Sequence, residues 1–378
     1  MNILIIGGGI GGPALATFLA RQGKRVTLIE QASAWKNIGF GVNVWGIGRK
    51  VLAELGVDAK LEPFGYPVET IDLSTPAGQK IFSLDFDTFL PYGGRQIVVP
   101  RAKLHELILE ALHSSVEVLL GTTVIELQQD GKQVRVHLSD GTTRTFDLVV
   151  GADGINSKTR EFVSRDDVRY YDLSVSVFWL PEGVPCPKNP TGMSRVGSAL
   201  WFYPLLDRTF IATSIRISPF QKISIRDRLA PFRQYFIEHG WREEDLQKVI
   251  DSEGTHYVDD LKYVRRGPWS KGRVALLGDA RHGFIPTVGM GASMALEDAK
   301  VLAEELAKVD TENIEQALVA YAQRRNPRVD RVRRFSAFTE VWCNPRSIWP
   351  AMSLWLMPRA VTRFLLQKMV LRILKQKI

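Results

Sequence analysis

The feature that most constrains the fold is a glycine-rich turn that follows a short apolar run at the start of the chain. Residues 3–6 are all apolar and mostly β-branched, which is typical of a buried parallel strand. Residues 7–12 then read GGGIGG, in which Gly7, Gly9 and Gly12 have the GxGxxG spacing. Apolar residues at helical spacing follow, so the sequence predicts a strand, a tight turn and a helix of an open α/β sheet.

A second predicted strand, residues 26–29, follows that helix and ends at Glu30. Glu30 lies about 20 residues after the glycines, where an acidic side chain binds a ribose hydroxyl in dinucleotide-binding folds. The glycines let the backbone approach a pyrophosphate, and free N–H groups at the helix start stabilise its charge. The unit therefore predicts a site for an ADP-containing dinucleotide and leaves open whether the ligand is FAD or NAD.

Two further predicted strands end in a glycine that an aspartate follows within two residues. Residues 146–150 lead into GADG (residues 151–154), and residues 274–277 lead into GDA (residues 278–280). Open α/β sheets bind their ligands at the carboxyl ends of the strands. Either motif alone could be a turn with an aspartate cap, but three such motifs favour one shared site.

Together these motifs resemble those of the single-component FAD-dependent aromatic hydroxylases, the family of para-hydroxybenzoate hydroxylase, salicylate hydroxylase and the tetracycline-inactivating monooxygenases. The resemblance runs from residue 1 to about 330 and includes PRxxL at residues 100–104 and the stretch from Gly278 to Ala299. It implies an α/β fold with a Rossmann-like FAD-binding domain of the GR2 type, an interleaved β-sheet substrate domain and C-terminal helices.

The resemblance also implies roles for individual side chains. Glu30 would bind the adenosine ribose, Arg101 would reach the FAD linker, Asp153 would lie near the pyrophosphate and Asp279 would bind the ribityl chain. NADPH or NADH would dock transiently, because the family has no separate nicotinamide domain. The other positions expected at the cofactor are Gly7, Gly9, Gly12, Gly41, Gly154, Pro286, Gly289 and Gly291.

The isoalloxazine ring is expected at the start of a helix near Gly291. Apolar residues recur at helical spacing after this point, so the free N–H groups of the helix point toward Gly289. A reduced flavin carries negative charge, which a positive helix end stabilises. The two glycines permit a close approach, Pro286 fixes the loop, and the segment around Gly41 resembles the family's other flavin-flanking loop.

The resemblance implies a monooxygenase that uses NAD(P)H and dioxygen to hydroxylate an aromatic or polycyclic small molecule through a flavin 4a-hydroperoxide. Phe178, Trp201 and Tyr203 are expected to form a wall of the substrate pocket, and ordinary sheet core is an equal alternative. Arg281 stands where the family usually has alanine. We expect its side chain to point to solvent, and pairing with an anionic substrate is the alternative.

No residue of the sequence is assigned as a catalytic acid or base. His282 is expected to be structural, and the remaining histidines have no metal-ligand spacing, so no metal site is predicted. Alternative functions are an FAD-dependent reductase or halogenase of the same fold, acting on a lipid or aromatic substrate, and a non-catalytic FAD-binding protein. A plain NAD dehydrogenase is disfavoured by the second and third glycine-acid motifs.

The chain is expected to divide into two interleaved domains and a terminal extension. A hairpin turning at residues 76–78 is predicted between parts of the nucleotide domain, and hairpin-like strands are predicted from Val116 to Leu138. The predicted limits are 1–70, 96–172 and 266–330 for the FAD-binding domain, 71–95 and 173–265 for the substrate-binding domain, and 331–378 for a basic helical extension.

Charge and cysteine usage set the remaining expectations. Residues 341–378 contain seven Lys or Arg and no Asp or Glu, so the net charge of +8 is concentrated at the C-terminus. We expect a solvated helix face there, with peripheral contact to an anionic membrane as the alternative and no role in binding nucleic acid. Cys186 and Cys343 form no disulfide or zinc pattern, which favours the cytoplasm. The protein is expected to be a monomer or homodimer.

Overall fold

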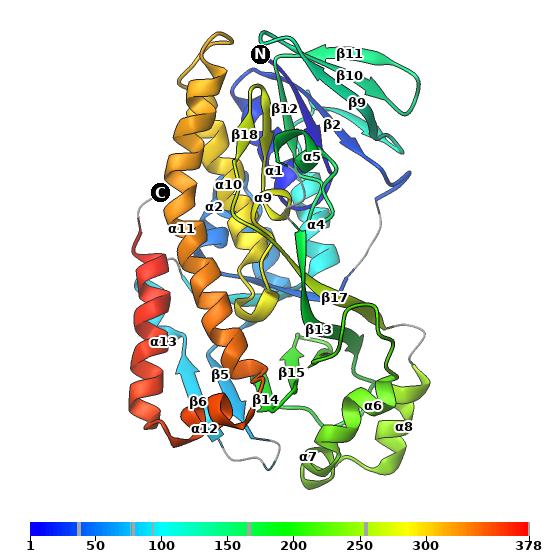
Figure 1. The fold of residues 1–378 in the computed structure, drawn as a ribbon, viewed down its shortest axis with the longest axis vertical. Coiled ribbons are helices and arrows are strands. Elements are labelled where there is room, and N and C mark those ends of the chain that lie inside the picture. Colours follow the sequence, from blue (N-terminus) through cyan, green and yellow to red (C-terminus); the bar gives the residue numbers. More distant parts are fainter. Residues whose placement is uncertain are drawn as a thin grey trace.

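The computed structural model describes residues 1–35, 39–75, 77, 80–92, 94–164, 168–252 and 256–376. The half of the molecule that contains the three glycine motifs lies above a second, larger sheet, and long helices run along one side of both (Figure 1). The glycine motifs and the aromatic residues expected at the substrate pocket can therefore be placed on described helices, strands and loops.

The upper half is built on a six-stranded sheet with β1 near its centre. Its strands are buried on both faces, because Ile3 and Ile5 pack with the helices while Leu4 packs with the small sheet β9–β11. This two-sided burial explains why the predicted strands read as continuous apolar runs. The order of the strands is β18 (Ser270–Lys271), β19 (Val274–Leu276), β12 (Leu148–Gly151), β1 (Asn2–Ile6), β2 (Arg25–Glu30) and β8 (Glu117–Leu120).

The prediction of hairpin-like strands from Val116 to Leu138 is wrong for the first of these strands. β8 pairs in parallel with β2, with Leu28 opposite Val118, and so belongs to the main sheet. Antiparallel pairing begins only after it, with turns at residues 130–131 and 140–141. That meander consists of β9 (Val124–Gln129), β10 (Val134–Leu138) and β11 (Thr143–Phe146).

Helices cover the other face of the six-stranded sheet. α10 is central among them, because it packs against α1, α2 and α11 at once. The helices of this half are α1 (Gly11–Arg21), α2 (Gly46–Leu55), α3 (Asp58–Leu61), α4 (Arg101–Glu110), α5 (Thr159–Val163), α9 (Asp279–His282), α10 (Gly291–Leu306) and α11 (Ile314–Cys343).

A small antiparallel sheet connects the two halves of the molecule. Its central strand pairs Val99 with Val42 on one side and Val98 with Tyr66 on the other. This sheet carries the Gly41 segment to the boundary between the halves. Its strands are β3 (Gly41–Val44), β7 (Ile97–Pro100) and β4 (Tyr66–Pro67).

The lower half is a seven-stranded sheet to which two separate chain segments contribute. The predicted hairpin is present, because Thr70 pairs with Asp85 and Ser74 with Lys80; its turn residues Pro76 and Gly78 lie outside the described residues. The order is β17 (Tyr257–Val264), β13 (Val168–Trp179), β16 (Thr209–Ile215), β15 (Ser198–Pro204), β14 (Thr191–Arg195), β5 (Thr70–Ser74) and β6 (Lys80–Asp85). Helices α6 (Ile225–Leu229), α7 (Arg233–Glu238) and α8 (Glu243–Asp251) cover one of its faces.

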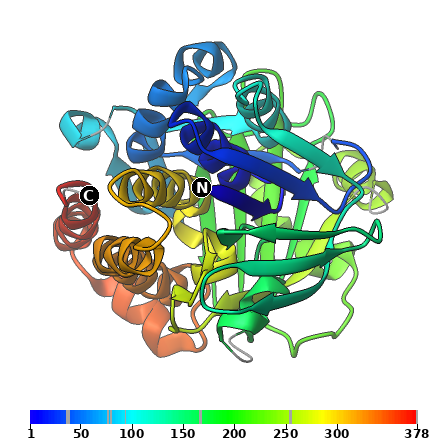
Figure 2. The same cartoon turned by 90° about the horizontal axis from the view of Figure 1, so that it is seen from above.

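The C-terminal segment is helical and packs on the rest of the chain. α11 runs without interruption across residue 331, where the predicted extension begins, and α12 (Ile348–Leu356) and α13 (Arg359–Leu374) follow. Seen end-on, α10, α11 and α13 lie side by side (Figure 2). Within the described residues, no helix combines the length and the apolarity needed to cross a bilayer.

Candidate functional site

The three predicted glycine motifs meet at one edge of the six-stranded sheet. β1, β12 and β19 are neighbouring parallel strands, so their carboxyl ends lie together. The Ala152 N–H donates to the carbonyl of Ile6 at 2.8 Å, and the Leu277 N–H donates to the carbonyl of Gly151 at 2.9 Å. The ends of three segments far apart in the sequence therefore form one continuous surface.

The glycines of the first motif are glycines for different structural reasons. Gly7 has a φ of +112°, and a Cβ there would meet the Ala152 carbonyl, while a Cβ on Gly12 would lie well under 3.0 Å from the Gly7 carbonyl. Gly9 differs, because nothing lies within 4 Å of where its Cβ would be. Gly7 and Gly12 are therefore needed for close packing of the backbone, whereas Gly9 borders open space that a ligand could occupy.

Helix α1 begins directly at this loop with an unblocked N-terminus. Its N-cap, Ile10, provides no side-chain hydrogen bond, and its first turn contains no acidic residue. The N–H groups of the first turn are thus left without a side-chain acceptor, and the positive end of the helix faces the loop. Such a terminus suits a phosphate group.

Glu30 and His105 form hydrogen bonds with the backbone of the glycine loop. Glu30 Oε2 accepts the Gly8 N–H at 2.8 Å, and its Oε1 accepts the Ala32 N–H at 2.9 Å. His105 Nε2 lies 2.6 Å from the Gly8 carbonyl, and burial lowers its pKa, so the neutral ring donates this hydrogen bond. The sequence reasoning missed His105, although it lies one helical turn after Arg101 and so on the same face of α4.

Asp153 organises its own loop. Its Oδ1 accepts the Ser157 hydroxyl at 2.5 Å, and its Oδ2 accepts both the N–H and the hydroxyl of Thr159 at 3.0 and 2.9 Å. The backbone of Gly154, with φ +77°, makes the turn between them. Buried Arg160 donates to the carbonyl of Ala280 at 2.9 Å, which connects this loop to the third motif.

Asp279 begins α9 at this same edge of the sheet. Its side chain is exposed, but the surrounding protein atoms desolvate the carboxyl group, which raises its pKa. The positive charges of His282 and Arg101 act in the opposite direction. Arg101 itself begins α4, and its backbone N–H donates to the Phe40 carbonyl at 2.8 Å.

The segment before α10 has the features expected of a ring-binding loop. α10 begins at Gly291, its N-cap Met290 provides no side-chain hydrogen bond, and its first turn has no acidic residue. Gly289 has a φ of +60° and lies against the amide of Asn43. Pro286 begins the preceding turn and is exposed.

Asn43 carries a polar atom that the described residues do not satisfy. Its Oδ1 is buried and has no hydrogen-bond partner in the part of the chain that the structure describes. A buried acceptor without a partner is costly, and this one lies on β3 beside Gly289. Trp45 fixes the two segments together, because its Nε1 donates to the Val288 carbonyl at 3.1 Å. Asn43 was not predicted from the sequence.

A buried ionic cluster supports these loops from behind. Asp298 accepts the Gly278 N–H at 2.9 Å, His282 Nε2 at 2.6 Å and Arg325 Nε at 2.6 Å, and all three side chains are fully buried. Burial raises the pKa of Asp298, but the positive charges of His282 and Arg325 outweigh it and lower the pKa overall. Arg325 also pairs with Glu297 at 2.9 Å. His282 is structural here, as expected.

Aromatic side chains of the large sheet reach the Gly41 segment. Tyr203 stacks on Phe210 at 4.9 Å between ring centroids and on Trp201 at 6.1 Å. Phe40 lies 5.2 Å from Trp179 and 6.3 Å from Phe210, and a Cβ on Gly41 would overlap the Phe210 ring. We call Phe40, Trp179, Trp201, Tyr203 and Phe210 the aromatic wall.

Phe178 does not belong to this wall and instead fits the alternative of ordinary sheet core. Directly paired residues share a face of a sheet, and Phe178 pairs with Ile211 while Trp179 pairs with Phe210. Phe178 therefore packs under α6–α8, stacked on His256 at 4.4 Å. The sequence could place Trp201 and Tyr203 on one face, since they are two residues apart, but it could not fix the register of β13.

The expectation that Arg281 points to solvent is also wrong. Its side chain is 4% exposed and lies over the ring of Trp269, 5.0 Å from the centroid. Its guanidinium group donates to the carbonyls of Arg265 and Gly267. In this arrangement Arg281 fastens α9 to the loop before β18 and is not directed at the aromatic wall.

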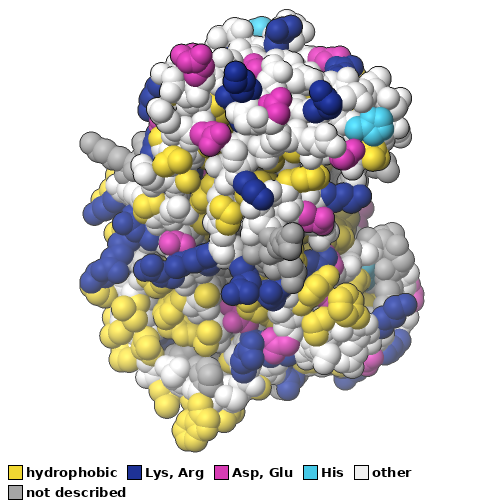
Figure 3. Space-filling view, turned by 45° about the horizontal axis from the view of Figure 1, so that its top comes forward, with side chains coloured by type: hydrophobic (Ala, Val, Ile, Leu, Met, Phe, Trp, Pro, Cys, Tyr) yellow, Lys and Arg dark blue, Asp and Glu magenta, His cyan; other side chains and the backbone are white. Residues whose placement is uncertain are grey.

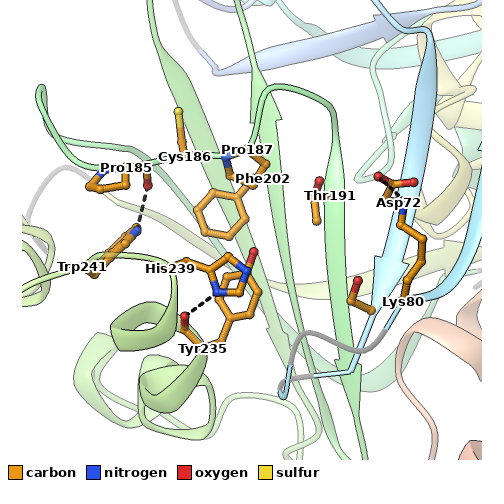
Figure 4. Close-up of a pocket in the computed structure, with 11 residues that line it drawn as sticks. Asp72, Lys80, Pro185, Cys186, Pro187, Thr191, Phe202, Tyr235, His239 and Trp241 are labelled. Carbon is orange, nitrogen blue, oxygen red and sulfur yellow. Dashed lines mark hydrogen bonds and ion pairs between the residues drawn. The ribbon is translucent and has the colours of Figure 1, made fainter.

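A separate pocket of about 280 Å³ lies on the other face of the seven-stranded sheet (Figure 4). Phe202 and Tyr235 line it with His239, whose Nδ1 lies 2.9 Å from the Tyr235 carbonyl. Asp72 and Lys80 form an ion pair at 3.2 Å at its rim. This pocket shares none of the predicted site residues.

The residues at this edge of the sheet fit FAD. An open space at Gly9, two unblocked helix N-termini and an unsatisfied acceptor at Asn43 correspond to a ligand with a pyrophosphate and a hydrogen-bonding ring. The fold and the site thus define an FAD-binding α/β protein with an attached substrate sheet.

Comparison with known proteins gives the family. The chain belongs to the family described as "FAD binding domain", whose model matches residues 1–188 and 204–336. It is 30% identical over 359 residues to 6-hydroxynicotinate 3-monooxygenase of Pseudomonas fluorescens, covering 89% of this chain and 90% of the relative. The family and its relatives establish a flavin-dependent monooxygenase, an oxidoreductase with FAD as cofactor and NAD(P)H as electron donor.

Solved structures agree on the fold. Klebsiella pneumoniae HpxO complexed with FAD and uric acid has a TM-score of 0.83 at 24% identity, covering 98% of this chain and 97% of that one. P. aeruginosa PqsL in complex with 2-aminobenzoylacetate has a TM-score of 0.76 at 26% identity, covering 93% and 99%. The predicted fold class is thereby confirmed, and the family and its relatives confirm the predicted cofactor and type of enzyme.

Proposed function

We propose that the protein hydroxylates an aromatic or polycyclic small molecule that binds between the aromatic wall and the loop from Pro286 to Gly291. The observation that carries this proposal is that Phe210, a member of the wall, packs directly against Gly41 of the flavin-flanking segment. The small molecules in the names of the three relatives all contain an aromatic or heterocyclic ring, which supports the same class for this chain.

The cofactor would extend along the edge where the three glycine motifs meet. Its pyrophosphate would lie at Gly9 and the start of α1, with Asp153 and Gly154 shaping the adjacent loop. Its ribityl chain would lie at Asp279, and its ring at the start of α10. Glu30 would bind the adenosine ribose with the capacity its oxygens retain beside their two backbone hydrogen bonds.

The residues of the chain would contribute binding, orientation and exclusion of water. FAD, when bound, supplies electron transfer from NAD(P)H and the activation of dioxygen. The N-terminus of α10 would stabilise negative charge placed before it. Phe40, Trp179 and Phe210 would keep water from the reacting atoms. Burial raises the pKa of Tyr203, so its hydroxyl stays protonated at neutral pH and can donate a hydrogen bond to substrate.

The organisation of the chain and its setting are part of the same proposal. The FAD-binding domain would comprise 1–70, 96–172 and 266–330, although β5, β13 and α11 continue across three of these limits. The protein would act in the cytoplasm as a monomer or homodimer, and its basic C-terminal helices would make peripheral contact with a membrane.

An absorbance spectrum and a compound screen test the proposal. The purified protein should be yellow, and aromatic compounds should accelerate NADPH or NADH oxidation, with oxygen from labelled dioxygen incorporated into the product. A saturated product would indicate a reductase, and incorporation of halide would indicate a halogenase. A yellow protein that oxidises no nicotinamide with any compound would indicate a non-catalytic FAD-binding protein.

A further inference from the structure

The outer face of α12 and α13 exposes large apolar side chains in one place. Trp349 and Leu356 are each 74% exposed, and Phe364 is 59% exposed. Apolar side chains gather over this end of the molecule, with Lys and Arg beside them (Figure 3). Single exposed apolar residues are common on protein surfaces, but a group rimmed by charges marks an interaction site. With Ile348 and Val361, these residues form the apolar part of what we call the α12–α13 surface.

This surface is firmly attached to the body of the protein. The inner stripe of α13, formed by Thr362, Leu366, Val370 and Ile373, is buried against α11, β6 and the turn at residues 87–92. Arg328 of α11 donates to the carbonyl of Ile373 and so fixes the end of α13. The sequence showed no clean apolar stripe in this segment, yet the helix has one buried face, and its exposed apolar residues lie outside that face.

The cations of α13 form no ion pair within the described residues. No described carboxylate forms an ion pair with any of the five basic residues of α13 and its end. Lys368 instead lies over the ring of Phe364, 5.6 Å from its centroid. The positive charge is therefore not compensated within the described chain. The five residues are Arg359, Arg363, Lys368, Arg372 and Lys375.

A groove between α11 and α13 adds a place for anionic groups. Its volume is about 890 Å³, and Arg331, Lys368, Arg372 and Lys375 line it together with Phe364. Cations and an aromatic ring thus border the same open groove. This combination suits a ligand that is anionic at one end and apolar at the other.

We propose that the α12–α13 surface binds an anionic phospholipid bilayer. The apolar side chains would enter the boundary of the acyl chains while the cations contact lipid phosphates. A second copy of this chain is a poorer partner, because a two-fold contact would bring two basic surfaces together. Nucleic acid would match the cations but leave the exposed Trp349, Leu356 and Phe364 without a partner. This inference makes specific the membrane contact proposed above, and it does not depend on the chemistry of the flavin site.

Vesicle flotation of the FAD-loaded protein tests the proposal. We expect binding to vesicles of phosphatidylcholine with roughly one third phosphatidylglycerol, weak binding to phosphatidylcholine alone, and release at about 1 M salt. The triple change Arg363→Gln, Lys368→Gln and Arg372→Gln should lower the partition coefficient about fivefold per charge, or about 100-fold in total. A matched triple change of Lys132, Arg135 and Lys158 to Gln, at the opposite end of the molecule, should leave binding unchanged.

The apolar contribution has its own test. Trp349→Ser should weaken binding to the anionic vesicles, whereas Phe220→Ser, which removes another exposed aromatic ring, should not. The flavin absorbance and the thermal unfolding of each variant show that it is folded, independently of any activity. Absence of binding to anionic vesicles, equal binding to both kinds of vesicle, or equal effects of surface and control variants would overturn the proposal. So would a salt-sensitive complex with DNA without vesicle binding, or a dimer that Trp349→Ser dissociates.

Discussion

Replacing Gly9 and Gly12 by alanine, one at a time, should separate the binding of FAD from the stability of the fold. At Gly12 the added methyl would lie well under 3.0 Å from the Gly7 carbonyl, where neither backbone can yield. Overpacking of this kind costs about 1–3 kcal/mol, and more where the structure is rigid. At Gly9 nothing lies within 4 Å and the backbone has no positive φ, so the apoprotein should change by no more than about 0.5 kcal/mol.

For the binding of FAD, the substitution at Gly9 is the one expected to have a direct effect. A methyl at Gly9 occupies the space where the pyrophosphate would approach the backbone, and we expect the Kd for FAD to rise about 10-fold to 100-fold, equivalent to about 1.4–2.8 kcal/mol. Chemical denaturation of the apoprotein gives the first quantity, and titration of apoprotein with FAD, followed by quenching of flavin fluorescence, gives the second. The reasoning is refuted if Gly9→Ala binds FAD like the wild type, or if it destabilises the apoprotein as much as Gly12→Ala does.

Three further experiments, with five substitutions in all, test other parts of the account. Arg325→Met removes one ion-pair partner from each of two buried carboxylates of α10, Glu297 and Asp298, and should cost about 3–5 kcal/mol in chemical denaturation. Arg324→Met, which removes a partly exposed arginine, should cost less than about 1 kcal/mol; similar costs would contradict the role given to the cluster. Asp279→Asn should stabilise the apoprotein at neutral pH. The folded-state pKa of Asp279 is raised above its unfolded-state value, so the wild type loses stability as the pH rises from the unfolded-state pKa to the folded-state pKa. The difference in stability between wild type and variant should vanish at a pH below the unfolded-state pKa of about 3.9. Phe178→Ala should lower the free energy of unfolding by about 3–5 kcal/mol. Trp179→Ala should instead increase the fraction of NAD(P)H oxidation that yields hydrogen peroxide without hydroxylated product. If the two substitutions have each other's effects, the faces of β13 have been assigned wrongly.

The nucleotide half could be predicted largely from local patterns. The glycine motifs, Glu30 and the start of α10 at Gly291 depend on short-range constraints, such as a tight turn or an unblocked helix end, that leave a signature in adjacent residues. The structure brings all three motifs to one edge because parallel neighbours in a sheet place their carboxyl ends together.

The parts that the sequence could not determine depend on long-range packing. Phe178 and Trp179 are adjacent, and only the pairing of β13 with β16 decides which of them faces the cofactor side. The orientation of Arg281 depends on Trp269 and the loop before β18, and no local pattern encodes that contact. Likewise, the pairing of β8 with β2 could not be distinguished from a hairpin, because a short, mostly apolar strand suits either neighbour.

The most direct test is a crystal structure of the protein grown with excess FAD. The account predicts continuous density for one FAD molecule, with its pyrophosphate at Gly9 and its ring between Gly41 and the loop from Gly289 to Gly291. A flavin bound elsewhere, for example in the pocket beside Tyr235, or no flavin density along the edge where the three motifs meet would contradict it.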